Sequence, residues 1–519
     1  MKYIYQFVKT KIAALLLILA ITSCTDDFSE INRDPNSIAV IGKGELPFLF
    51  TKAQDAQAWG GQVEENLFAD QYCQYVANVA PYFSSDQYEI VMDWVVSFWT
   101  GHFVATMPQL NTIMELTEPT SGEYALATIM MVYSTHRVTD YWGPIPYSKA
   151  GIPGLVVEYD SQKDIYYDLF VKLTDAVATL EEMKGQNVFG SYDIIYGGNV
   201  EQWIKFANTL RLRLAIRISK VDPTKAKAEA EAAYQAGVLE DNTDNAFALN
   251  SIADVNTISR MSEWNEFRMS AAMESAMTGY SDPRLPEYWI PAVNTGTYEG
   301  IRNGLNAVQL GETENTADAA SHIGPRWTSP ASGGINDYLS TPSNVMCAAE
   351  AYFLRAEGAL LGWDMGGTVQ ELYETGISTS LKQWGITDAS TIDAYIANTS
   401  TPIAPDDYLD SRPLNDIPVK FNESDQVMQN KQIAMQKWLA LFPDGVEAWA
   451  DYRRNPVLNL YPVANSKNPD IPDPSEKYIR RIPFLVYEYQ SNAPAVENAI
   501  NLLEVKEDKI TTPVWWDVN

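Results

Sequence analysis

Cysteine and histidine are scarce in this sequence of 519 residues. None of them stands in a CxxC, HxxxH or HExxH spacing, and the complete set is Cys24, Cys73, Cys347, His102, His136 and His322. Zinc sites and catalytic thiol sites in proteins depend on such spacings. The sequence therefore predicts no metal site, no cofactor and no catalytic residue of these types.

Basic side chains are also few. There are 37 Lys and Arg residues against 67 Asp and Glu residues, which gives a formal net charge of -30 at pH 7. Nucleic acids and other polyanions are bound by basic surfaces. This composition excludes nucleic acid as a partner, and it fits either plain solubility or a neutral or cationic ligand.

Aromatic side chains, in contrast, are abundant, with 14 Trp and 29 Tyr residues. Such rings suit large buried interfaces as well as surfaces on which sugar rings stack. Both uses indicate a protein that recognises other molecules rather than one that carries out redox chemistry.

The N-terminus has the pattern of an export signal. Lys2, Lys9 and Lys11 precede an apolar run over residues 12–21, which is too short to span a bilayer. The run ends in Ile-Thr-Ser followed by Cys24, a sequence typical of lipoprotein processing. We expect a signal peptide over residues 1–23 and a lipid on Cys24; the alternative is an ordinary signal peptide with a chance cysteine.

After Cys24 the sequence predicts a tether and then one helical domain. Residues 24–44 are polar and rich in turn formers, and residues 45–519 form the predicted domain. Apolar periodicity and helix-stop signals within the domain predict helices over residues 46–79, 86–118, 122–142, 162–184, 199–219, 224–236, 263–278 and 342–361. Arg211, Arg213 and Arg217 lie in one of these helices, and we expect them to pair with carboxylates.

Four stretches of distinctive sequence follow one another along the domain. The first runs from Arg137 to Ala150 and holds Tyr-Trp-Gly-Pro-Ile-Pro-Tyr-Ser, and the second is Ala-Glu-Ala-Tyr-Phe-Leu-Arg-Ala-Glu at residues 349–357. The third covers residues 436–456 and the fourth residues 480–488. Together with the lipoprotein signal, their order resembles the SusD/RagB family of nutrient-binding lipoproteins of Bacteroidetes.

This resemblance implies both a fold and a function. The fold would be mainly α, with a SusD-like helical body of degenerate tetratricopeptide-type helix pairs and an irregular, loop-rich half. The protein would bind a glycan or another nutrient and pass it to a SusC-like TonB-dependent transporter, without being an enzyme. The acidic pair Asp26-Asp27 resembles the signal that sends such lipoproteins to the outer face of the outer membrane, where only the lipid would hold the protein.

The least regular part of the domain, residues 281–342, is the predicted ligand region. Long loops in compact proteins often carry function, and this one holds aromatic rings next to polar side chains. Candidate ligand-binding residues are Tyr288, Trp289, Tyr298, Arg302, Asn303 and Trp327, with Tyr82 on a separate loop. The alternative is that these rings only pin the loop onto the helical body.

Three other functions are compatible with the sequence. A surface glycoside hydrolase would need two carboxylates on opposite sides of a scissile bond, and no pair stands in a catalytic motif. A peptide-binding member of the same family would share every feature above. A pure protein–protein scaffold would not need the aromatic loop region.

Replacing Cys24 with Ala should release the protein from membranes, because the lipid is its only predicted anchor. Membrane fractionation and incorporation of labelled palmitate measure this. A Cys24→Ala variant that stays membrane-bound and still takes up the label would contradict the prediction.

Overall fold

The structure, a computed structural model, describes Met1 and residues 41–56, 65, 67–152, 154, 156–251, 255–329 and 337–519. Its contacts divide the chain into two units, Met1–Leu46 and Pro47–Asn519. The predicted signal peptide, Cys24 and most of the predicted tether lie outside the described residues.

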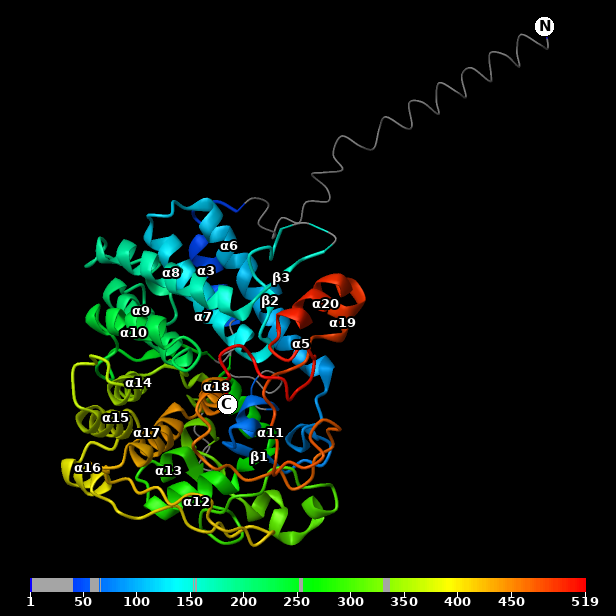
Figure 1. Ribbon diagram of the computed structural model, residues 1–519, viewed down its shortest axis with the longest axis vertical. Coiled ribbons are helices and arrows are strands. Elements are labelled where there is room, and N and C mark those ends of the chain that lie inside the picture. The colour runs from blue at the N-terminus through cyan, green and yellow to red at the C-terminus, as the bar shows by residue number, and fades with distance from the viewer. Residues whose placement is uncertain are drawn as a thin grey trace. The chain divides into compact units, whose positions relative to one another are not determined.

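Helices dominate the described part of the larger unit (Figure 1), as the sequence predicts. The first group is α3 (Leu46–Ala56), α4 (Ala69–Tyr72), α5 (Met92–Thr100), α6 (Met107–Leu116), α7 (Gly122–Trp142), α8 (Gln162–Glu181), α9 (Val200–Arg217) and α10 (Pro223–Gln235). The second is α11 (Thr257–Trp264), α12 (Ala271–Tyr280), α13 (Leu285–Tyr288), α14 (Ala348–Leu360), α15 (Val369–Gln383), α16 (Ala389–Ile396), α17 (Gln426–Leu441), α18 (Gly445–Arg454), α19 (Val486–Ser491) and α20 (Ala493–Leu502).

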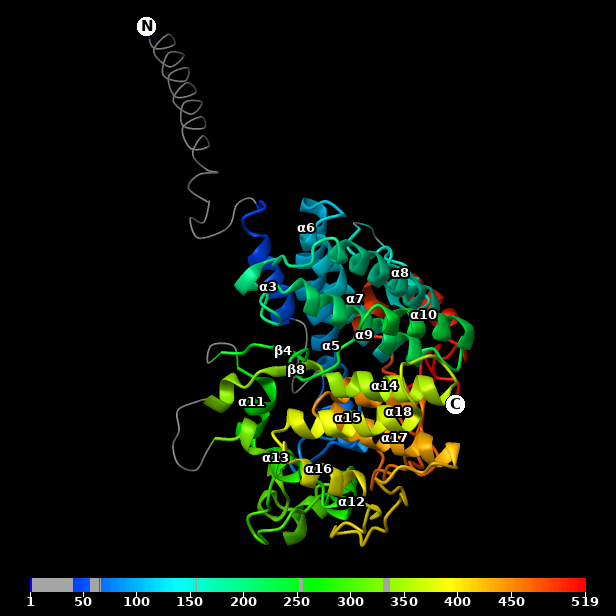
Figure 2. The same ribbon diagram turned by 90° about the vertical axis from the view of Figure 1, so that its left-hand side faces the viewer.

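The long helices pack in series. Helix α7 contacts α8, α8 contacts α9, and α9 contacts both α10 and α14. Helix α14 then packs on α15 and α17. Helices α15 and α17 lie side by side in both views (Figures 1 and 2). The apolar faces of these helices are buried against one another and form the core of the unit.

The strands in the described residues form four small antiparallel sheets of two strands each. The pairs are β1 (Val76–Asn78) with β5 (Phe267–Met269), β2 (Ile145–Pro146) with β3 (Tyr159–Asp160), β4 (Ala246–Ala248) with β8 (Ser343–Met346), and β6 (Trp289–Ile290) with β7 (His322–Ile323). Three of these pairs join segments that are far apart in the sequence, so they fasten loops to the helical body.

The predicted helices over residues 122–142, 162–184, 199–219 and 224–236 are confirmed as α7 to α10. Helix α7 ends at Gly143, whose φ of 80° would strain any residue with a side chain, and Pro144 follows it. The paired arginines are also confirmed: Arg211 contacts Glu229, Arg213 contacts Glu350, and Arg217 contacts Glu447.

Three other predicted helices are wrong in part. In place of one helix over residues 46–79, α3 ends at Ala56 and residues 76–78 form β1. The helix predicted over residues 263–278 is interrupted. Helix α11 ends at Trp264, because Asn265 takes a left-handed conformation with φ of 61°, and strand β5 follows. Residues 343–346 are strand β8 rather than the start of α14. In each case pairing with a distant strand overrides the local helical pattern.

The helix predicted over residues 86–118 begins later, at Met92, and changes its winding in the middle. Residues 101–106 form a π-helical segment between α5 and α6. A π-helical segment turns its side chains away from the directions of a regular helix, and such segments are frequent at functional sites.

A buried carboxyl group, Asp86, fixes the loop that follows β1. It accepts hydrogen bonds from the backbone N–H groups of Gly304 (3.1 Å) and Asn78 (3.4 Å). Burial raises the pKa of this carboxyl to about 7, although these hydrogen bonds and Lys467 lower it. The folded protein therefore keeps a proton on Asp86 over a pH range in which the unfolded chain has already released it.

The contribution of Asp86 to the free energy of unfolding should fall as the pH rises from about 4 to about 7, because the folded state binds the proton more tightly. An Asp86→Asn variant should gain stability relative to the wild type across this window, by at most about 4 kcal/mol. Urea unfolding at the two ends of the window measures the difference. Exposed Asp93→Asn is the control, and a difference for Asp86→Asn that does not change with pH would contradict the prediction.

Candidate functional site

The aromatic rings predicted to stack on a ligand in residues 281–342 lie in the interior. Tyr288 and Trp289 are fully buried, and Trp327 is 3% exposed. All three rings surround Phe442, with ring centroids 4.6, 5.4 and 5.9 Å from its own. The interpretation of these three residues as a stacking surface is therefore wrong: they pin the loop region to α17 and the segment after it.

The polar candidates of this region also have structural partners. Asn303 donates a hydrogen bond to the carbonyl oxygen of Val76 at 2.9 Å. Arg302 stacks over the ring of Tyr461 at 4.7 Å and donates to the carbonyl oxygen of Pro462 at 2.6 Å. The side chains of Asn303 and Arg302 are both buried, and their hydrogen bonds hold loops together. Tyr298, another candidate, is half-buried.

Tyr82, the remaining candidate, is exposed and belongs to a cluster of rings. It is 66% exposed, and its ring meets Phe83 edge to face at 4.7 Å. Phe83 contacts the half-buried Trp94 of α5 at 5.5 Å and stacks on buried Phe267 of β5 at 6.0 Å. We call Tyr82, Phe83 and Trp94 the aromatic patch.

Carboxylate groups border the aromatic patch. The hydroxyl group of Tyr82 donates a hydrogen bond to Glu266, which raises the pKa of that hydroxyl. Two residues earlier, Trp264 is 46% exposed at the end of α11, and Glu263 accepts a hydrogen bond from Tyr338. The segment 263–266 thus brings the carboxylate of Glu266 to the patch and carries an exposed ring, Trp264, two residues earlier.

Sequence reasoning found Tyr82 but not Trp94 or Trp264. Both were placed within predicted amphipathic helices, where a large ring is expected in the core. The buried residues of α5 are Val95, Phe98 and Trp99, and Trp94 precedes that face. Attention to the face on which each ring falls would have singled it out.

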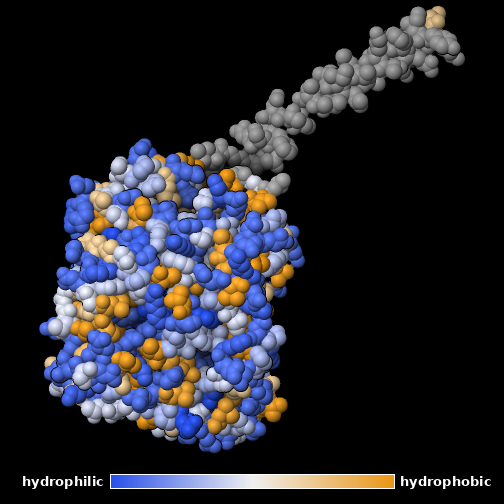
Figure 3. All heavy atoms as spheres, in the orientation of Figure 1, coloured by the Kyte–Doolittle hydropathy of each residue, from blue (hydrophilic) through white to orange (hydrophobic). Residues whose placement is uncertain are grey.

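One face of the molecule is mixed in character, because Figure 3 shows apolar residues in small groups among polar ones on the face in view. Within the described ranges, no helix has the length and apolar character needed to cross a bilayer, and no three His, Cys, Asp or Glu side chains gather as a metal site would require.

The chain is similar to one protein family and to several solved structures. The model of the SusD-like family, described as SusD and RagB outer membrane lipoprotein, matches residues 36–517. The comparison with curated proteins finds no match.

Among solved structures, a chitin-binding SusD homolog from Flavobacterium johnsoniae is 35% identical, with a TM-score of 0.83 over 92% of this chain and 99% of its own. A SusD homolog from Bacteroides uniformis is 32% identical, with a TM-score of 0.81 over 91% and 99%. A structure described as a chitin-binding protein is 26% identical, with a TM-score of 0.75 over 91% and 100%.

Replacing Trp289 with Ala should destabilise the fold by about 3–5 kcal/mol, because the change leaves a large cavity against Phe442. Thermal melts should show a clear loss for Trp289→Ala and almost none for Tyr82→Ala, whose ring is exposed. Equal melting temperatures for the two variants would mean that Trp289 does not serve the core.

Proposed function

Because the chain belongs to the SusD-like family of outer membrane lipoproteins, we propose that it binds glycan chains at the cell surface through the aromatic patch. The observation that carries this proposal is the cluster of exposed Tyr82 with half-buried Phe83 and Trp94, next to the carboxylate of Glu266. The protein acts by binding and leaves the glycosidic bonds intact.

Sugar rings match this arrangement chemically. The C–H faces of a pyranose ring pack on aromatic side chains, while its hydroxyl groups donate hydrogen bonds to carboxylates. Neighbouring rings at centroid distances of 4.7 and 5.5 Å offer several such contacts to successive sugars. The net charge of -30 favours a neutral or cationic glycan over an anionic one.

Chitin-type oligosaccharides are the first ligands to test. Two of the similar structures are described as chitin-binding, and N-acetylglucosamine chains are neutral. An N-acetyl group adds a methyl group for the rings of the patch and an amide N–H for the carboxylate of Glu266, so both parts of the site have a partner on the ligand.

The proposal includes how the protein is held and what it serves. A lipid on Cys24 holds it to the outer membrane, facing the outside, and a TonB-dependent transporter takes over the bound glycan. The sequence Ile-Thr-Ser-Cys24 followed by Asp26-Asp27 and the family description support this part. Co-purification of a transporter from mild detergent tests the partnership, and recovery of the protein alone at native expression counts against it.

Replacing Trp94 with Ala should weaken binding of chitin oligosaccharides by about 5–150-fold, because a stacked ring contributes roughly 1–3 kcal/mol. Calorimetric titration of the protein without residues 1–23 measures the affinity, and thermal melts check the fold. Tyr408→Ala is the matched control, since Tyr408 is 39% exposed outside the patch. Unchanged affinity for Trp94→Ala and Tyr82→Ala, or cleavage of the oligosaccharide during the titration, would refute the proposal.

A further inference from the structure

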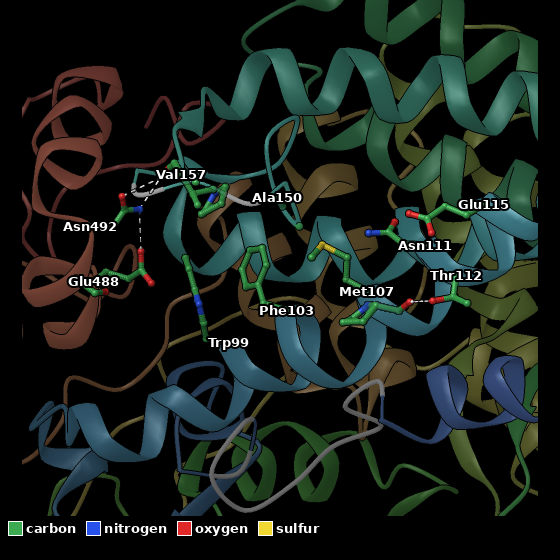
Figure 4. Close-up of a pocket in the computed structure, with 15 residues that line it drawn as sticks. Trp99, Phe103, Met107, Asn111, Thr112, Glu115, Ala150, Val157, Glu488 and Asn492 are labelled. Carbon is green, nitrogen blue, oxygen red and sulfur yellow. Dashed lines mark hydrogen bonds between the residues drawn. The ribbon is translucent and has the colours of Figure 1, made fainter. Parts of the chain in front are cut away.

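A hollow lies on α5, the π-helical segment and α6, away from the residues of the aromatic patch. Its volume is about 560 Å³, within the range of about 300–1,000 Å³ found for small-molecule sites. Figure 4 shows Trp99, Phe103 and Met107 along one side, with Glu488 and Asn492 at one end and Asn111 and Glu115 at the other.

The apolar side of the hollow lies where α5 meets the π-helical segment. Trp99 lies in the last turn of α5, and Phe103 lies in the π-helical segment, with ring centroids 4.5 Å apart. Trp99 also meets Trp142 edge to face at 5.3 Å, and Trp142 is fully buried. The helical body therefore holds Trp99 in place, while half-buried Phe103 faces the hollow.

One end of the hollow is fixed by Asn492. Its side chain accepts a hydrogen bond from the N–H group of Val157 at 3.1 Å and donates one to the carbonyl oxygen of the same residue at 2.9 Å. Glu488 accepts a hydrogen bond from the hydroxyl group of Tyr159 at 2.8 Å through its Oε2 atom. Its Oε1 atom has no protein partner within the described ranges and remains available to a ligand.

At the other end, Asn111 and Glu115 stand one turn apart on α6. Neither side chain makes a hydrogen bond or an ion pair with any residue that the structure describes. Among the residues that the structure describes, no Lys or Arg lines this hollow. An adjoining hollow of about 690 Å³ shares Asn111 and Glu115 and adds Asp160, Asp164 and Asp168 against a single Lys172. The charged side chains that line the two hollows are thus mainly acidic.

We propose that this hollow is a second ligand site, which takes a short saccharide that carries a free amine. The sugar faces pack on Phe103, which Trp99 supports from behind, the hydroxyl groups bond to Asn111 and Glu488, and the ammonium group pairs with Glu115. Charge-assisted hydrogen bonds between an ammonium group and a carboxylate are stronger than neutral ones. Carboxylates without basic neighbours disfavour an anionic sugar. This site does not depend on binding at the aromatic patch.

A charge series of disaccharides tests the proposal. Titrations of the protein without residues 1–23 use a glucosamine disaccharide, cellobiose and a uronic acid disaccharide at about pH 6, where amines are protonated. The glucosamine disaccharide should bind most tightly, cellobiose more weakly, and the uronic acid disaccharide not at all. Equal affinity for the glucosamine disaccharide and cellobiose would overturn the proposal.

Two variants locate the binding. Phe103→Ala should weaken binding of the glucosamine disaccharide by about tenfold, through loss of the stacking face. Glu115→Gln should weaken it by about threefold to tenfold and reduce the preference over cellobiose. Val104→Ala and Glu118→Gln are the controls, because both residues are exposed and neither lines either of these two hollows.

The same titrations separate this site from the aromatic patch. Trp94→Ala should leave binding of the glucosamine disaccharide unchanged, even where it abolishes binding of chitin oligosaccharides. If Trp94→Ala removes the binding, and Phe103→Ala and Glu115→Gln do not, the second site is refuted while glycan binding at the patch stands. If Trp94→Ala changes the binding of no ligand, while Phe103→Ala and Glu115→Gln weaken binding of the glucosamine disaccharide, the patch is refuted and the second site stands.

Discussion

Buried pairs of arginine and carboxylate hold the helices of this chain in register. Arg213 of α9 contacts Glu350 of α14 at 2.6 Å, and Arg217, one turn later, contacts Glu447 of α18 at 2.6 Å. All four side chains are almost completely buried. A buried charge that loses its partner costs about 3–5 kcal/mol. A shift of α9 by one turn relative to α14 or α18 would separate these pairs and leave charges buried without partners. The pairs therefore fix the relative positions of the three helices and of the loops that join them.

The four stretches of distinctive sequence meet around this network. Arg453, in the third stretch, donates hydrogen bonds to the carbonyl oxygens of Asp140 in the first (2.7 Å) and Arg480 in the fourth (2.8 Å). Arg481 donates to the carbonyl oxygen of Trp142 at 3.1 Å, and the second stretch supplies Glu350. The residues that carry the family resemblance thus build the packing centre, so a ligand has to be sought on the loops and helix ends around it.

Periodicity along the sequence was enough to predict the long helices. Helices α8 and α10 bury one face each, and α7 and α9 are buried over most of their surface but keep apolar residues at helical spacing. It could not predict β1 or β5, since each has only three residues and forms by pairing with a segment about 190 positions away. Because long-range pairing cannot be seen in the local pattern, the prediction also took buried rings of residues 281–342 for ligand-binding residues. Trp289 lies in a stretch without helical periodicity, yet strand β6 carries it against Phe442. Tyr82 was a better candidate because no element of its own loop covers it.

Helix α5 shows how one rigid element can serve two surfaces. Trp94 and Trp99 are five positions apart, which in an α-helix is a rise of about 7.5 Å and a rotation of about 140° around the axis. Trp94 therefore joins Phe83 in the aromatic patch, while Trp99 joins Phe103 on the side of the hollow. Phe103 lies four positions after Trp99, so the two rings fall on the same side of the chain. Trp99 is buried there, whereas half-buried Phe103 has its ring open to the hollow. Two surfaces of different chemistry, an aromatic patch around exposed Tyr82 and an open hollow whose charged side chains are acidic, thus meet the two sides of a single helix.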